Sequence, residues 1–376
     1  MFRLLHSADN HLRGQQYARS SRGEDFSKAF LDVVHTAIRR KIAVIMIAGD
    51  LLDSTRPSPK IIEFLKTVDA LACKHGIQIL VTSGNHDLTE PHWAKIAGVE
   101  AQRSCGLRMI DNELVTLPNG LTIYGQPFVN KEKWLEIKDT LPAADILMFH
   151  GMIAELTAGF KDPSAIDLAQ LPTDRYQVIA LGDIHHRKYV RVNTGTGMGR
   201  GCLVGYPGST ELCEAGEDEN KTVTELTFDD NGRLVTEEPV FLPVKTRHVL
   251  RFKLNTEDEV EEALLLAETQ KSTDPIVFIE YNAKLRTVPQ RFAARLDPTK
   301  VLIRPYPMMR DPKVQGLGND VRENLPLVAF LDKFIPPGGP LHALGTALLS
   351  PSANVVELVD RYIETRRQEL ETLGVV

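Results

Sequence analysis

The sequence predicts a layered α/β protein of more than one domain. Over residues 1–190, short apolar runs of strand length alternate with longer segments of helical periodicity, which is typical of such a fold. The hydrophobic content of 43% and the charged content of 25% are those of a globular chain and argue against a disordered or collagenous one. At 376 residues the chain is too long for one ordinary domain, so we expect two or three.

The strands of the first domain are expected where apolar residues run together without helical spacing. They are Arg3–Ser7, Ile42–Ala48, Ile77–Thr82, Leu121–Gly125, Ile146–Phe149 and Val178–Leu181. The segment Asp25–Lys41 is expected to be a helix because Phe26, Phe30 and Val33 fall on one side of it. Pro59–His75 is expected to be the next helix.

A domain boundary is expected near residues 243–246, directly after a predicted hairpin. The hairpin strands are Thr222–Phe228 and Arg233–Phe241, joined by the turn sequence Asp229–Gly232. Beyond the boundary the pattern reads strand, helix, strand, helix, strand, at His248–Leu254, Glu259–Lys271, Pro275–Asn282, Val288–Leu296 and Lys300–Pro305. We therefore expect a first domain at residues 1–243 and a small α/β domain at residues 246–308, near the minimum size that folds alone.

Residues 309–376 are expected to form a linker and two helices. The composition is linker-like from Met309 to Asp320, and the helices Asn324–Phe334 and Asn354–Leu373 flank a segment rich in proline and glycine. In the last helix the apolar residues form one broad stripe. That stripe packs either on its own domain or on the helices of a partner, and the sequence leaves both open.

The charge and the termini limit the class of protein. The net charge of −6 argues against a chain that wraps nucleic acid through a basic tail. Arg13, Arg19 and Arg22 nevertheless flank the first cluster of polar residues, where a DNA backbone would pass. The N-terminal sequence lacks the apolar core of a signal peptide, and we expect a cytoplasmic protein with no membrane attachment. Four cysteines without CxxC spacing predict neither a disulfide framework nor a zinc knuckle.

Almost every expected strand of the first domain runs into aspartate, histidine or asparagine. These residues are Asp9, Asn10 and His11 after the first strand, Asp50 after the second, Asn85, His86 and Asp87 after the third, and His150, Asp183 and His185 after two later strands. Sites in open α/β sheets form at the carboxyl ends of strands, so we expect these side chains to meet at one edge. The alternative is ordinary capping of loops by aspartate, asparagine and histidine.

The residue types at these strand ends suit a borderline divalent cation. Mixed imidazole, carboxylate and amide ligands favour manganese, iron or zinc over calcium. Asp9 and His11 share a face of the chain and can reach one ion, and Asp50 can bridge two ions. Two ions about 4 Å apart can generate hydroxide and hold a phosphate for in-line attack. His86 then protonates the leaving oxygen, and Asp87 orients His86.

Five blocks of this sequence resemble, in order and spacing, the calcineurin-like metallophosphoesterases. The blocks are Asp9-x-His11, Gly49-Asp50, Gly84-Asn85-His86-Asp87, His150-Gly151 and Gly182-x-x-His185. Three longer segments, residues 47–53, 180–185 and 206–209, are similar to one branch of that family, the SbcD nuclease subunits of bacterial SbcCD complexes. The resemblance covers residues 1–240, and five blocks in register are a specific signal.

The resemblance implies a fold, a ligand set and partners. The implied fold is an αββα-type sandwich with a small α/β capping domain and C-terminal helices. The implied ligands of one ion are Asp9, His11, Asp50 and His185, and those of the other are Asp50, Asn85, His150 and Asp183, with His86 as catalytic acid. We expect two divalent ions, with Mn²⁺ preferred. The implied partners are DNA, a second copy of the chain and an SbcC-like coiled-coil ATPase that binds the C-terminal helices.

Two positions depart from the family pattern. The family usually has histidine where this chain has Asp183; a carboxylate can still bind a metal there, but it adds negative charge, and capping of the next turn is the alternative role. Relatives in the eukaryotic and archaeal branch have histidine at the position of Asp53. An aspartate there leaves His86 as the main proton donor.

Three functions are consistent with the sequence. The first is a two-metal DNA exonuclease or endonuclease that works as a homodimer with an SMC-like ATPase in DNA end processing, repair and recombination. The second is a stand-alone phosphodiesterase for small nucleotides or phosphoproteins, which would need no capping domain or partner helix. The third is a DNA-binding subunit whose metal site is degenerate, a reading that Asp183 and Asp53 support.

Overall fold

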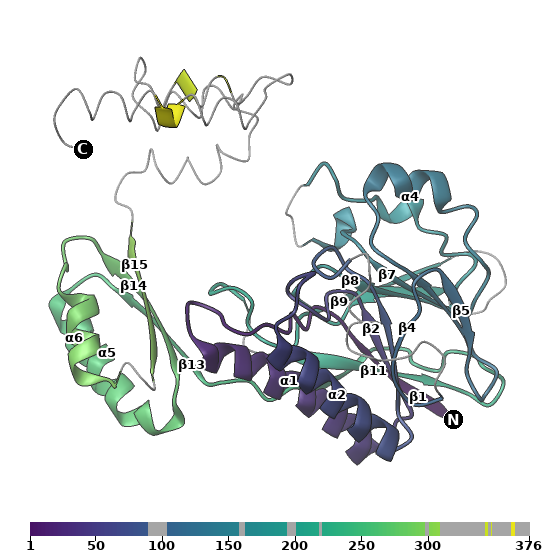
Figure 1. Cartoon of the computed structure of the whole chain (residues 1–376), viewed down its shortest axis with the longest axis horizontal. Coiled ribbons are helices and arrows are strands. Elements are labelled where there is room, and N and C mark those ends of the chain that lie inside the picture. The colour runs from purple at the N-terminus through teal and green to yellow at the C-terminus, as the bar shows by residue number, and fades with distance from the viewer. Residues whose placement is uncertain are drawn as a thin grey trace. The chain divides into compact units, whose positions relative to one another are not determined.

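The structure is a computed structural model in which two compact units, Met1–Val249 and Leu250–Val376, are distinguished (Figure 1). It describes residues 1–88, 104–157, 162–193, 201–217, 220–297, 301–308, 343–344, 347 and 362–364. The expected linker and the expected helices Asn324–Phe334 and Asn354–Leu373 lie outside the described residues, except that residues 362–364 are helical. None of the helices described has the length and apolar character needed to cross a bilayer.

The first sheet of unit Met1–Val249 has the strand order β12-β11-β1-β2-β3-β4. The strands are β1 (Phe2–Ser7), β2 (Val44–Ala48), β3 (Gln78–Thr82), β4 (Gly106–Met109), β11 (Thr222–Phe228) and β12 (Val240–Pro243). From β1 to β4 each strand is parallel to its neighbour, whereas β11 runs antiparallel to both β1 and β12. The parallel strands therefore deliver their carboxyl ends to the same edge of the sheet.

The second sheet has the strand order β5-β6-β7-β8-β10-β9. Its strands are β5 (Glu113–Thr116), β6 (Thr122–Gln126), β7 (Ile146–His150), β8 (Val178–Gly182), β9 (Lys188–Val192) and β10 (Cys202–Tyr206). The four central strands are parallel, and only the edge strands β5 and β9 run against their neighbours. This sheet thus also collects the ends of parallel strands at one edge.

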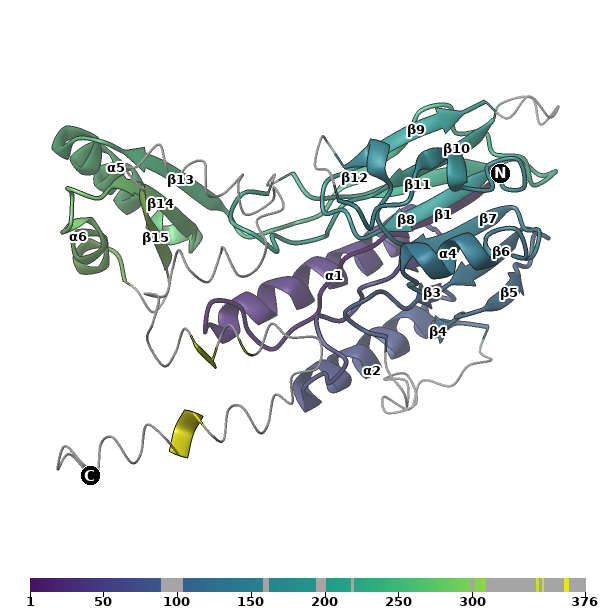
Figure 2. The ribbon, with the colours of Figure 1, turned by 90° about the horizontal axis from the view of Figure 1, so that it is seen from above.

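The two sheets pack face to face, with helices on the outside. Helices α1 (Ser20–Arg40) and α2 (Pro59–Lys74) run side by side over the first sheet and bury Phe26 and Phe30 against it (Figures 1 and 2). Between the sheets, Met46 of β2 and Met148 of β7 belong to one apolar cluster. On the far face of the second sheet, α4 (Lys131–Ile137) stacks Trp134 on Phe149 at 4.3 Å. The predicted layered αββα arrangement is confirmed.

The expected hairpin after β11 is wrong in its second half. The turn at Asp229–Gly232 forms, and the residues directly after it contact the end of β11 through a bridge from Leu234 to Phe228 and a hydrogen bond from the Val235 N–H to the Thr227 carbonyl oxygen at 2.8 Å. Residues 233–239 nevertheless form no strand. The Leu234 N–H donates to Gln177 Oε1 at 2.8 Å, which holds this segment against the second sheet. The strand that pairs with β11 is therefore β12, which begins at Val240.

A disulfide corrects a second expectation. Cys73 at the end of α2 is bonded to Cys105, which lies just before β4. The two cysteines are 32 residues apart, so no local spacing indicates the pairing, which depends on β4 lying beside β3. Cys202 and Cys213 are free thiols.

Unit Leu250–Val376 contains a three-stranded sheet of order β13-β14-β15, covered by two helices. The elements are β13 (Val249–Leu254), α5 (Glu257–Gln270), β14 (Ile276–Asn282), α6 (Val288–Arg295) and β15 (Leu302–Met308). A capping box between Thr256 and Glu259 begins α5. The pattern strand, helix, strand, helix, strand occurs as expected, and the apolar sides of α5 and α6 form one core with β13 and β14.

Candidate metal centre

The polar strand ends predicted from the sequence converge on one edge of the sandwich. Asp9, Asp50 and Asn85 follow β1, β2 and β3 of the first sheet, and His150 ends β7 of the second. His150 Nδ1 donates to the Ala48 carbonyl oxygen at 2.9 Å, which ties the end of β7 to the end of β2. Two sheets therefore contribute side chains to a single site.

The close approach of β8 to β2 explains why residue 182 of the sequence motifs is glycine. A Cβ at Gly182 would lie 1.9 Å from the Ala48 carbonyl oxygen, so only glycine lets β8 come this close to β2. Several site residues also have a strained backbone, with φ of 50° at Asp9, 44° at His11 and 113° at Asp183. Non-glycine residues in such conformations concentrate at functional sites, where the surrounding fold imposes them.

The inner half of the site is rich in carboxylate, and three of its side chains are buried, whereas Asn85 is exposed. Asp9, Asp50 and His150 are 0%, 2% and 0% exposed, and each offers an atom within 4.8 Å of the others. Because Nδ1 of His150 donates to Ala48, its Nε2 is left to face the centre. That Nε2 lies 3.0 Å from Asn85 Oδ1 and 3.6 Å from Asp50 Oδ2. These are mixed imidazole, amide and carboxylate donors around one point.

Asp183 lies beside this inner half. Its N–H donates to Asp9 Oδ1 at 3.0 Å, and its own Oδ1 is 3.9 Å from His150 Nε2. The side chain of Asp183 is thus directed at the imidazole of His150, which is compatible with a role as a metal ligand. Among the contacts described, no hydrogen bond from this side chain supports the alternative role in capping the next turn.

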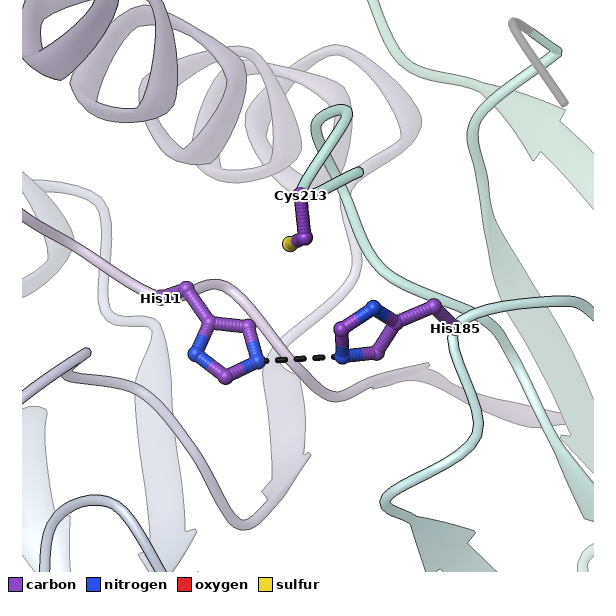
Figure 3. Close-up of side chains that lie close together, drawn as sticks. All are labelled: His11, His185 and Cys213. Atoms are coloured by element: carbon purple, nitrogen blue, oxygen red, sulfur yellow. Dashed lines mark hydrogen bonds between the residues drawn. The ribbon is translucent and has the colours of Figure 1, made fainter. Parts of the chain in front are cut away.

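The outer half of the site contains two imidazoles and a thiol (Figure 3). His11 Nε2 and His185 Nε2 face each other at 3.1 Å, and Cys213 Sγ lies within 4.8 Å of a ring nitrogen of each. His185 Nδ1 donates to Glu217 Oε1 at 2.7 Å, so its Nε2 points to His11. Two facing nitrogen atoms repel unless a proton or a cation lies between them, and this pair is therefore suited to a shared cation.

His86 lies at the rim of the site. Its N–H donates to Asp50 Oδ1 at 3.0 Å, while its ring is 44% exposed and Nδ1 is 3.2 Å from the Asp53 carbonyl oxygen. Asp53 also forms an ion pair with Arg13 at 2.6 Å. The ring of His86 is thus next to the buried carboxylates without being enclosed by them.

Asp87 does not orient His86 as expected. It is 0% exposed, and its carboxylate accepts from the Gly84 N–H at 2.7 Å and the Leu52 N–H at 3.2 Å. These bonds hold the turn that carries Asn85 and His86. We therefore assign Asp87 to the shape of the turn, whereas Asp53 Oδ1 lies 4.0 Å from Nδ1 of the His86 ring.

The arginines expected to meet a DNA backbone have different surroundings. Arg22 is 0% exposed and donates to Asp25 Oδ2 at 2.8 Å and to the Leu212 carbonyl oxygen at 2.8 Å. It therefore cannot contact DNA, and instead joins α1 to the segment that carries Cys213. Arg13 is paired with Asp53, as described above.

The pKa directions reflect the excess of carboxylate in the inner half. Burial lowers the pKa of His150, but the charges of Asp50, Asp9 and Asp183 outweigh burial and raise it. Burial raises the pKa of Asp183, and Asp9 and Asp50 raise it further. Burial, with help from Asp50, also raises the pKa of Asp87 to about 6. A divalent cation would stabilise such a cluster of anions, so the residues present fit a metal.

Sequence reasoning did not select Cys213 and Glu217, which the structure places at the site. Glu217 accepts from His185 Nδ1 and from Lys221 Nζ at 2.6 Å, and these partners outweigh burial and lower its pKa to about 2. A carboxylate behind a metal-binding histidine fixes its tautomer and orientation. Both residues follow the segment at residues 206–209, which is the only signal in the sequence that points to this region.

Comparisons with known proteins relate this chain to a family of phosphoesterases. Residues 2–187 match the family described as calcineurin-like phosphoesterase. The chain is similar to DNA double-strand break repair protein Mre11 of Methanosarcina acetivorans, at 26% identity over 301 residues that cover 76% of this chain and 46% of the relative. The proteins of the same name from Archaeoglobus fulgidus and Sulfurisphaera tokodaii are 27% and 26% identical, over 70% and 75% of this chain and 63% and 73% of theirs. The chain thus spans about half the length of the first relative.

Proposed function

We propose that the chain, whose residues 2–187 match the calcineurin-like phosphoesterase family, is a two-metal DNA nuclease. The observation that carries the proposal is the convergence of Asp9, Asp50 and His150 at the carboxyl ends of β1, β2 and β7, with ligand atoms all within 4.8 Å of one another and all three residues buried. The similarity of the chain to relatives named for DNA double-strand break repair supports DNA as the substrate.

We assign the ligands of two divalent ions by position in the site. The outer ion would be held by Asp9, His11, Asp50 and His185, and the inner ion would be held by Asp50, Asn85, His150 and Asp183. The contacts between His11 and His185 and between His150 and Asn85 support this division. The mixed oxygen and nitrogen donors favour Mn²⁺ among the cations discussed.

The chain's own residues then serve the hydrolysis of a phosphodiester. When bound, the two ions activate a water and stabilise the charge that develops on the phosphate. Water adds to phosphorus, the bond to the leaving oxygen breaks, and that oxygen takes a proton. His86 is the donor we assign, because its ring is exposed at the rim and its Nδ1 is occupied by the Asp53 carbonyl oxygen, which leaves Nε2 for the substrate.

The partners of the nuclease belong to the same proposal. We propose that it acts as a homodimer with an SMC-like ATPase in DNA end processing and repair. The chain has no Walker-type G-K-[ST] sequence, so ATP would have to be bound by the partner. Residues 309–376 are the proposed binding segment for that partner.

Cleavage of linear DNA by the purified chain tests the proposed function. We expect Mn²⁺-dependent release of nucleotides or fragments, which excess chelator abolishes and added Mn²⁺ restores. A small phosphodiester such as bis(p-nitrophenyl) phosphate serves as the comparison substrate. Hydrolysis of the small diester alone would identify a small-molecule phosphodiesterase, and metal binding without hydrolysis of either substrate would identify a DNA-binding subunit.

A further inference from the structure

The thiol of Cys213 belongs to the outer half of the site by position. It lies within 4.8 Å of ring nitrogens of His11 and His185, in the segment that follows β10 (Figure 3). The side chain is directed towards the space between the two rings (Figure 3). Cysteine, unlike the oxygen donors of the inner half, is a soft ligand that binds zinc, iron and cobalt strongly.

The backbone around Cys213 is fixed by the group that also orients His185. The Cys213 N–H donates to Glu217 Oε2 at 3.0 Å, and the other oxygen of that carboxylate accepts from His185 Nδ1 at 2.7 Å. On the other side, Gln16 Nε2 donates to the Cys213 carbonyl oxygen at 2.6 Å. One carboxylate therefore sets the positions of both the thiol and the imidazole.

The two imidazoles supply the independent indication of a ligand at this place. His11 is 3% exposed, and its Nδ1, on the side of the ring away from His185, lies 3.4 Å from Asp53 Oδ1. Its Nε2 faces the Nε2 of His185 at 3.1 Å. Buried nitrogen atoms in this arrangement are stabilised by a cation, and Cys213 is next to the position that such a cation would take.

We propose that Cys213 is a thiolate ligand of the ion held by His11 and His185. As the bond from Sγ to the cation forms, the thiol proton leaves to solvent and no electron is transferred. The outer ion would then have a sulfur and two imidazoles beside the carboxylates of Asp9 and Asp50, whereas the inner ion would have carboxylate, amide and imidazole without sulfur. The two positions should consequently differ in preference, with Zn²⁺, Fe²⁺ or Co²⁺ favoured at the outer one. This inference rests on the metal centre of the proposed function.

Cobalt spectroscopy of the full chain tests the ligand directly. A Co²⁺–thiolate bond produces an intense charge-transfer absorption in the near ultraviolet, which nitrogen and oxygen ligands do not produce. We expect this band on addition of Co²⁺ to the wild-type chain, its loss in Cys213→Ala and Cys213→Ser, and its retention in Cys202→Ala. Cys202 is a free thiol buried in β10 and serves as the matched control. Circular dichroism and equilibrium dialysis establish that each variant folds and binds Co²⁺.

Protection of the thiol gives a second measurement that does not require a variant. Cys213 is partly exposed, so iodoacetamide should alkylate it in the metal-free chain, and Co²⁺ should suppress that alkylation. A wild-type chain that binds Co²⁺ without the band, or a band that survives in both Cys213 variants, would overturn the inference. Those results leave the nuclease proposal intact if DNA is still cleaved, whereas a folded chain that binds no Co²⁺ contradicts the metal centre itself.

Discussion

Two fully buried histidines of this chain have opposite electrostatic surroundings. His6, within β1 and between the sheets, donates through Nε2 to the Leu181 carbonyl oxygen at 3.1 Å, and its Nδ1 accepts from the Tyr189 hydroxyl at 2.7 Å. Burial lowers the pKa of His6 to about 3, because the bond to Leu181 offsets only part of the desolvation. His150, at the end of β7 and equally buried, has a raised pKa because carboxylates surround it.

The difference separates the interior of the sandwich from its edge. In the interior, a buried imidazole is satisfied by neutral groups and stays neutral. At the edge, the carboxylates of Asp9, Asp50 and Asp183 attract positive charge although burial opposes it. A fold that places buried carboxylates at the ends of its strands therefore favours the binding of cations there. This conclusion follows from the charges and the burial and does not depend on a sequence motif.

The largest expected effect comes from removing the central carboxylate of the edge. Asp50→Asn keeps the shape of the side chain but removes the charge that both ions would share, so we expect cleavage of DNA to fall to the background of the assay. The melting temperature should stay near that of the wild type, because Asp50 follows β2 and lies outside the apolar core. Initial rates of DNA cleavage with Mn²⁺ and a thermal melt measure the two outcomes.

Asp230→Asn is the matched control for this substitution. Asp230 is exposed in a surface turn, where it pairs with the N-terminal amine. It should leave cleavage unchanged. Near wild-type cleavage by Asp50→Asn would remove Asp50 from the metal centre, and an unfolded Asp50→Asn would show that the carboxylate stabilises the metal-free fold.

The next largest effect is expected at the rim. His86→Ala should slow cleavage by about 10²–10⁴-fold, the usual contribution of a general acid, and leave metal binding intact, because the ring is exposed. Single-turnover cleavage and the number of ions bound per chain are the measurements. His35→Ala, on the exposed side of α1, controls for loss of a surface imidazole. Loss of a bound ion in His86→Ala would place His86 among the ligands instead.

The strands and most of the edge were predictable from the sequence because the polar residues directly follow buried apolar runs. His150 is an example, since it ends the buried strand β7, although its approach to Asp50 also depends on how the two sheets pack. The roles of Cys213 and Glu217 were not predictable, because their proximity to His185 depends on contacts such as that between Arg22 and the Leu212 carbonyl oxygen, which join distant segments. The misplaced second strand of the hairpin has the same cause, a bond between Gln177 and Leu234.

Substitution of Asp183 is expected to have a smaller effect than the substitutions above, because it should weaken the binding of only one of the two ions. Asp183→Ala should reduce the number of bound Mn²⁺ ions from two towards one, because the inner ion loses a ligand. Asp183→His should retain cleavage, since imidazole can occupy the same coordination position. Metal content after equilibrium dialysis and cleavage rate are the readouts. An unchanged metal content in Asp183→Ala would assign Asp183 to capping of the following turn.

The smallest effect concerns the interior, where the pH dependence of stability reports on His6. Its folded pKa of about 3 lies below the ordinary value of 6.5, so above pH 6.5 the ring is neutral in both the folded and the unfolded chain and the full stability is present. As the pH falls below 6.5, His6 takes up a proton only in the unfolded chain. The contribution of His6 to the free energy of unfolding therefore falls by about 1.4 kcal/mol per pH unit. Asp87, whose pKa is raised to about 6, makes the folded chain more stable as the pH falls, which opposes the effect of His6. This contribution is the same in the wild type and in a His6 variant, so it cancels when the two chains are compared. Urea unfolding at about pH 7 and about pH 5.5 should therefore show a drop for the wild type that exceeds the drop for His6→Gln by roughly 1 kcal/mol. His35→Gln should behave like the wild type, and equal drops in all three chains would mean that His6 is protonated in the folded interior as readily as His150 at the edge.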